Sequence, residues 1–133
     1  MTLLPILMVC AAPLVMLLFG RLMQLTASGP PNPLMGFRTR LSMSSADAWN
    51  YANTYLGYRW IRQGFALLCV SIFAILLAGF LGPTGWGADE EASAWLALGI
   101  LTGQLLWMGV SIRRARCHLR TIFNEDGTRI HPD

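Results

Sequence analysis

The sequence has no lysine and few charged residues of any kind, since only 13% of its 133 residues carry a charge. Three long runs, residues 3–20, 64–81 and 92–112, have no charge at all. Each run is close to the ~20 residues that an α-helix needs to cross a ~30 Å hydrocarbon core. With a hydrophobic content of 54%, this pattern excludes an ordinary soluble domain.

The uncharged runs predict the fold class directly. We expect an all-α membrane protein with three transmembrane helices, at about residues 3–23, 60–81 and 92–112. No internal repeat or low-complexity segment divides the chain, so residues 1–133 are predicted to form one domain.

Acidic residues and histidine are absent from the three runs as well. A proton relay needs a carboxylate or a histidine within the membrane, and a catalytic zinc helix needs histidines on one face. The two histidines, His118 and His131, follow the third run. We therefore predict that the protein is not an enzyme and that it carries no cofactor.

The three cysteines do not suggest disulfides or a metal site. Cys10 and Cys69 fall at different depths of their predicted spans, and Cys117 follows the third span. Cys117 is next to His118, but nothing nearby supplies the third and fourth ligands that zinc requires. The sequence thus predicts no metal site.

The arginines are confined to two segments, which predicts the orientation. Five lie between the first two spans and five follow the third, whereas residues 82–91 hold three acidic residues and no arginine. Cationic segments stay cytoplasmic, so the N-terminus is predicted outside and the C-terminus inside the cell. The arginines would then face the anionic lipids of the inner leaflet. That placement accounts for the net charge of +3 without a nucleic-acid partner.

A second helix is predicted to begin after Ser44, because Ser44 and Asp47 match the capping-box pattern. No proline occurs in residues 46–82, so the helix could continue for roughly 50 Å, which is longer than a bilayer core. The helix would then either project into the cytoplasm or bend at Gly57 or Gly64 to lie in the interface, and we favour the bend. Its first part, rich in tryptophan and tyrosine, would then form an interfacial helical segment that precedes the second span.

Proline, glycine and glutamine inside the spans predict how the helices pack. Pro13 removes an internal hydrogen bond and should kink the first span. The spacing Gly99-x-x-x-Gly103 lets a neighbouring helix approach closely. Gln104 lies near the middle of the membrane, where an amide needs a hydrogen-bond partner on another helix. The neighbour could be in this chain, in a second copy or in another membrane protein.

The polar segment between the first two spans carries the most specific pattern in the sequence. It reads Asn-x-x-x-Gly-Phe-Arg-Thr, then serines, then Trp-x-x-x-Asn. The residues of this pattern are Asn32, Gly36, Phe37, Arg38, Thr39, Ser42, Ser44, Trp49 and Asn53. Their order resembles the signature of the SdpI family of small bacterial membrane proteins, some of which are immunity proteins against a secreted toxin. The resemblance implies a multi-pass protein of the bacterial plasma membrane that acts by binding, in toxin immunity or membrane signalling.

Two interpretations of these signature residues remain open. In the first they form a docking site, because the Arg38 guanidinium offers a fork of donors to a carboxylate or a phosphate. In the second they are structural: Arg38 caps the carbonyl end of the first span, Thr39 and the serines cap helix starts, and Trp49 anchors the depth of the helix. An alternative function is also open, that of a small accessory subunit of a larger respiratory or transport complex in the membrane.

Overall fold

Three long helices account for most of the chain. The computed structural model describes residues 3–80 and 90–131, and its helices are α1 (Leu3–Ala27), α2 (Ala46–Phe80) and α3 (Glu90–Ile122). Each helix is long and apolar enough to cross a membrane. The predicted all-helical fold with three membrane spans is therefore confirmed.

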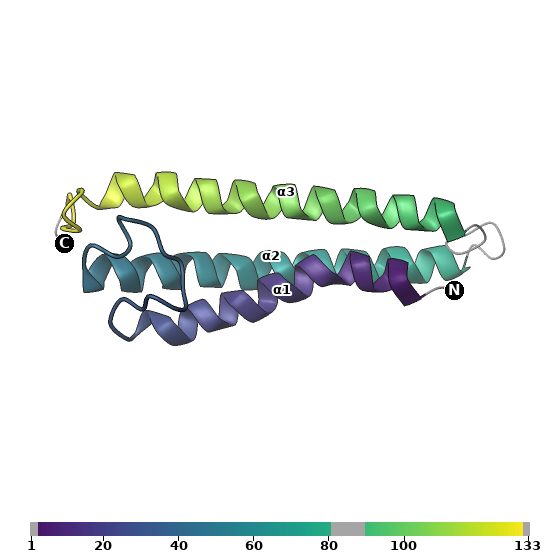
Figure 1. Cartoon of the computed structure of the whole chain (residues 1–133), viewed down its shortest axis with the longest axis horizontal. Coiled ribbons are helices and arrows are strands. Elements are labelled where there is room, and N and C mark those ends of the chain that lie inside the picture. Colours follow the sequence, from purple (N-terminus) through teal and green to yellow (C-terminus); the bar gives the residue numbers. More distant parts are fainter. Residues whose placement is uncertain (1–2, 81–89, 132–133) are drawn as a thin grey trace.

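The helices run alongside one another, so that the two termini lie at opposite ends of the molecule (Figure 1). One end carries the irregular segment at residues 28–45, the start of α2, the end of α3 and the C-terminal residues. We call it the polar end. It gathers segments that are up to about a hundred residues apart in the sequence, and the candidate functional site lies there.

The second helix is one continuous element of 35 residues, and no break separates an interfacial segment from the span (Figure 1). The prediction of a bend at Gly57 or Gly64 is therefore wrong. Both glycines pack against α1 instead: a Cβ built at Gly57 would lie 2.7 Å from the carbonyl oxygen of Gly20, and one at Gly64 would lie 3.0 Å from that of Pro13. Because these glycines have no side chain, the backbones of α1 and α2 can come into contact. The glycines therefore allow close helix packing and do not bend α2.

The glycines of α3 do not pack in this way. No described atom outside the helix lies within 4 Å of a Cβ built at Gly99 or Gly103. The expected close approach of a neighbouring helix is thus absent within the described chain, where Gly20, Gly57 and Gly64 provide it instead. Gly57 and Gly64 are seven residues apart and so share one face of α2, a spacing that the Gly-x-x-x-Gly pattern does not cover.

A polar contact joins all three helices inside the bundle. Pro13 has no N–H, so the carbonyl of Val9 four residues earlier loses its helical partner. The Oγ of Ser71 on α2 and the Nε2 of Gln104 on α3 both donate to this carbonyl oxygen, at 3.4 and 3.2 Å. The same Nε2 also lies 3.3 Å from the Oγ of Ser71. The Nε2 of Gln104 therefore has partners on two other helices of this chain, whereas its buried Oε1 has no partner among the described residues. The bonds from Gln104 and Ser71 satisfy the Val9 carbonyl that lacks a helical donor because of Pro13.

We expect Gln104→Leu to lower the free energy of unfolding by about 1 kcal/mol, the usual size of such bonds in membrane helices. In a Pro13→Ala background the loss should be smaller, because the restored N–H satisfies the Val9 carbonyl. Detergent unfolding of the four proteins in this double-mutant cycle measures the difference. Thr102→Val is the control, since among the described residues the Thr102 hydroxyl bonds only to the carbonyl oxygen of Leu98 in its own helix. An equal loss in both backgrounds would contradict the link to Pro13.

Candidate functional site

Two side chains of α2 cover the carbonyl end of α1. The Nε1 of Trp49 donates to the carbonyl oxygen of Thr26 at 3.0 Å, and the Nδ2 of Asn50 donates to that of Ala27 at 3.2 Å. The last carbonyls of a helix have no partner within it, so these bonds cap α1. The structural interpretation predicted that Arg38 caps α1, and this prediction is wrong. The Arg38 guanidinium donates instead to the Pro33 carbonyl oxygen inside the loop.

The signature segment is tied to α2 by Asn53. Its Oδ1 accepts a hydrogen bond from the backbone N–H of Phe37 at 2.6 Å, and its Nδ2 donates to the carbonyl oxygen of Trp49 at 2.9 Å. Gly36 lies directly over this pair with φ +111°, a conformation suited to glycine. Both Trp49 and Asn53 are fully buried. The loop is therefore held against the helix at one defined position.

The next part of the segment is a compact turn around Ser42. The Ser42 Oγ accepts from the backbone N–H of Thr39 at 2.8 Å and donates to the carbonyl oxygen of Phe37 at 2.7 Å. In return, the Thr39 Oγ1 accepts from the backbone N–H of Ser42 at 3.0 Å. Asn32 makes a similar local bond, in which its Oδ1 accepts from the N–H of Leu34. These side chains stabilise the loop from inside.

The cap of α2 is one residue later than predicted. The Oγ of Ser45 accepts from the backbone N–H of Ala48 at 3.0 Å, as an N-cap side chain does. The Oγ of Ser44 instead donates to the carbonyl oxygen of Leu41. Ser44 therefore belongs to the turn before the helix, and Ser45 begins the helix.

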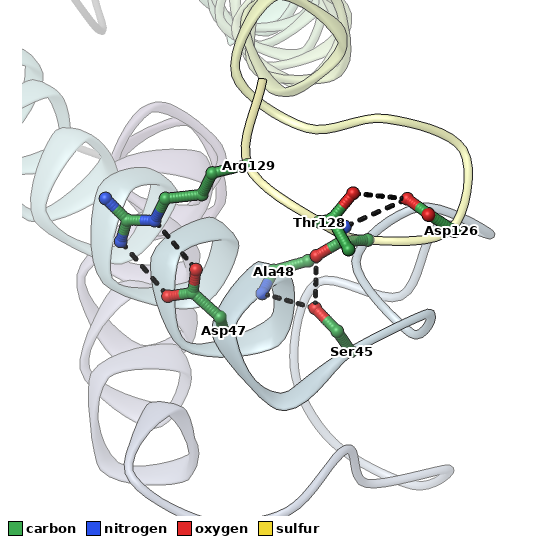
Figure 2. A network of polar contacts seen from close by, with 7 residues as sticks. Ser45, Asp47, Ala48, Asp126, Thr128 and Arg129 are labelled. Atoms are coloured by element: carbon green, nitrogen blue, oxygen red, sulfur yellow. Dashed lines mark hydrogen bonds and ion pairs between the residues drawn. The ribbon is translucent and has the colours of Figure 1, made fainter. Parts of the chain in front are cut away.

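The C-terminal residues fold back onto the start of α2, which the sequence did not predict. Phe123 and Arg129 form an antiparallel β-bridge across a turn, and we call residues 123–130 the C-terminal hairpin. The Ser45 Oγ donates to the carbonyl oxygen of Gly127 at 2.8 Å, and the Arg129 guanidinium makes two bonds to Asp47, at 2.7 and 3.0 Å. Figure 2 shows these contacts side by side.

The hairpin turn has its own polar contact at Asp126 (Figure 2). The hydroxyl and the backbone N–H of Thr128 both donate to Oδ1 of Asp126, and they lower its pKa below the ordinary value of 3.8. A lowered pKa means that this contact stabilises the turn above pH 3.8 and is lost as the pH falls through the lowered value. At neutral pH the turn is in its stable form.

We expect Gly127→Ala to release the hairpin from α2. Gly127 has φ +82°, and an added Cβ would clash with the Oγ of Ser44 and with the side chain of Ser45. Hydrogen exchange of the Ile130 amide, which bonds to Ile122, should then become at least tenfold faster. Asp47→Asn is the comparison: its ion pair with Arg129 is exposed, and exposed pairs contribute about 0–1 kcal/mol. If Asp47→Asn released the hairpin as strongly as Gly127→Ala, the close backbone contact at Gly127 would not be what holds the hairpin on α2.

Beside the hairpin lies a hollow of about 790 Å³ between the signature segment and the end of α3. Its basic lining residues are Arg38, Arg40, Arg116 and Arg120. Its apolar lining residues are Leu41, Leu119, Phe123 and Ile130. We call this site the basic hollow and the four cationic residues the hollow arginines.

The hollow arginines give the site a strong positive charge. Four arginines against one glutamate, Glu125, leave three positive charges in the lining. All four arginines are exposed. Within residues 3–80 and 90–131, Arg40, Arg116 and Arg120 make no hydrogen bond or ion pair, and Glu125 does not neutralise them. Their guanidinium groups are therefore available to an anion.

A comparison of the sequence with known protein families finds a match, and the match includes the signature segment. The family model of the SdpI/YfhL protein family matches residues 29–112, which is more than half of the chain. The chain belongs to the SdpI/YfhL family. Searches of curated proteins and of solved structures gave no match.

The family match covers only part of the site. It includes the signature segment and thus Arg38 and Arg40, and it ends at residue 112, before Arg116 and Arg120. The expected docking residue Arg38 lines the basic hollow, whereas the other signature residues mostly hold the loop in place. The signature pattern does not include Arg116 and Arg120, although their spacing of four places them on one face of a helix.

Proposed function

We propose that this SdpI/YfhL family protein acts by binding an anionic ligand in the basic hollow, in toxin immunity or membrane signalling, and that it catalyses no reaction. The observation that supports the proposal is the convergence of the hollow arginines. They come from two segments more than 70 residues apart, and they line one hollow. Arginine suits this role because its planar donors match carboxylate and phosphate groups.

The construction of the polar end supports binding as well. The loop that carries Arg38 and Arg40 is tied to α2 through Asn53, and the hairpin beside the hollow is tied to α2 through Ser45. A ligand would therefore meet side chains on a backbone that is already ordered. Such preorganisation lowers the entropic cost of binding. If the polar end is cytoplasmic, as the arginine distribution predicts, the ligand is one found inside the cell.

A deletion strain of the source bacterium tests this function. It should become sensitive to spent medium of the parent strain, or lose a transcriptional response to it, and the wild-type gene should restore the phenotype. Arg116→Gln/Arg120→Gln should accumulate in the membrane normally and fail to restore it. Arg113→Gln/Arg114→Gln is the matched control, because it removes the same charge from α3 outside the hollow lining. Full restoration by the hollow variant would contradict the proposal.

The open face of α3 favours a second candidate, the accessory subunit. Gly99, Gly103 and Gly109 have no described neighbour within 4 Å of an added Cβ, so another membrane helix could approach there. Gentle detergent extraction followed by native gel separation and mass spectrometry distinguishes the two. A discrete complex of fixed stoichiometry would support the subunit role, and a free monomer or small homo-oligomer would support the binding role.

A further inference from the structure

We infer that the ligand of the basic hollow is the phosphate headgroup of an anionic phospholipid of the surrounding bilayer. This inference rests on the binding function proposed above and names its ligand. It is carried by three properties of the site: the depth of the hollow relative to the membrane, the mixed chemistry of its lining, and its continuity with the lipid-facing side of α3.

The hollow lies at the height of the lipid phosphates. The uncharged run of α3 ends at Ile112. At 1.5 Å per residue, Arg116 lies about 6 Å beyond it and Arg120 about 12 Å beyond it. The headgroup layer extends about 5–7 Å past the hydrocarbon core on each side. Arg116 is thus within the headgroup layer, and the long side chain of Arg120 can reach down to its outer edge.

The lining of the hollow matches the two parts of a phospholipid head. Guanidinium groups bind phosphate oxygens with paired hydrogen bonds. Between them the hollow exposes apolar surface from Leu41 and Ile130. A small inorganic anion has no apolar groups that could bury this surface, whereas the glycerol and the first methylenes of a lipid would cover it. A basic pocket beside membrane helices is also where anionic headgroups bind in other proteins.

The face of α3 below Arg116 can accept an acyl chain. Ile112, Gly109 and Leu105 precede Arg116 by four, seven and eleven residues and therefore lie on the same face of the helix. Gly109 and Leu105 are exposed, and no described atom outside the helix lies within 4 Å of a Cβ built at Gly109. Ile112 packs partly against the core, and beyond it Gly109 and Leu105 present an exposed strip to lipid on the face of α3 below the hollow. A soluble ligand would leave this strip unused.

Native mass spectrometry of the full chain in detergent tests the inference. After delipidation, the protein is mixed with phosphatidylglycerol, with phosphatidylcholine or with sodium phosphate. We expect the wild type to retain one phosphatidylglycerol and little phosphatidylcholine. Arg116→Gln/Arg120→Gln should bind phosphatidylglycerol at least tenfold more weakly, since each variant side chain loses the paired, charge-assisted hydrogen bonds that a guanidinium in the hollow makes to the phosphate, and such bonds contribute about tenfold each. Arg113→Gln/Arg114→Gln should stay within about threefold of the wild type.

Three outcomes would overturn the inference. Equal losses in the two double variants would mean that lipid is held by general surface charge and not by the hollow. Equal retention of phosphatidylcholine would remove the role of anionic charge. Displacement of the lipid by sodium phosphate or by an acidic peptide at low millimolar concentration would show that the hollow takes a soluble anion.

The lipid-binding experiment and the complementation experiment can contradict their two proposals independently. Loss of complementation in Arg116→Gln/Arg120→Gln with unchanged lipid binding would leave the proposed function standing and remove the lipid as its ligand. Loss of lipid binding with full complementation would leave the lipid site standing and remove its role in immunity or signalling.

Discussion

Gly36→Ala is expected to destabilise the protein more than any other single methyl group added to the signature segment. The backbone of Gly36 has φ +111°, which strains any residue with a side chain. The added Cβ would also lie 2.6 Å from the Trp49 ring and 2.7 Å from Oδ1 of Asn53. Neither group can move aside cheaply, because the Trp49 indole is bonded to Thr26 and the Asn53 amide is bonded to Phe37.

The expected loss is about 3 kcal/mol of unfolding free energy, from roughly 1–3 kcal/mol of backbone strain and a similar cost of overpacking. Membrane accumulation and thermal unfolding in detergent measure it. Gly29→Ala is the matched control in the same connection, since the nearest atom to its Cβ is 3.7 Å away and its φ is not positive. If Gly36→Ala and Gly29→Ala were equally stable, the loop would not be held against Trp49 as described.

Gly57→Ala is expected to force α1 and α2 apart. The new Cβ would lie 2.7 Å from the carbonyl oxygen of Gly20, and this backbone atom can move only if the helix moves. Overpacking of this kind costs about 1–3 kcal/mol, more than the ~1 kcal/mol that alanine gains over glycine in helix propensity. Stability of the protein in detergent should therefore fall, and Gly20→Ala should produce the same effect from the other side of the contact.

Gly103→Ala is the matched control for the helix contact. A Cβ at Gly103 meets no described atom within 4 Å, so the isolated chain should become slightly more stable or stay unchanged. A loss as large as that of Gly57→Ala would mean that Gly103 packs against a second copy or another membrane protein. In that case the prediction for the isolated chain would be wrong, and the subunit role would gain support.

Much of the candidate site could be anticipated from the sequence, but the roles of its residues could not. The signature pattern singled out Arg38, Trp49 and Asn53, and the structure places all three at the polar end. It could not say that Trp49 caps α1 or that Asn53 fastens the loop, because those roles depend on the direction of each side chain in the packed helix. The position of Ser45 as the cap of α2, one residue after Ser44, follows from the same kind of local geometry.

The sequence by itself determined the three membrane helices, because an uncharged run long enough to cross the hydrocarbon core leaves the chain no alternative fold. It also determined the family, because the spacing of the signature is local. Only the tertiary structure decided which glycines bring helices together, how Gln104 satisfies the carbonyl that Pro13 leaves open, and which arginines share a hollow. These depend on contacts between residues more than 30 positions apart, and such contacts exist only once the helices have packed.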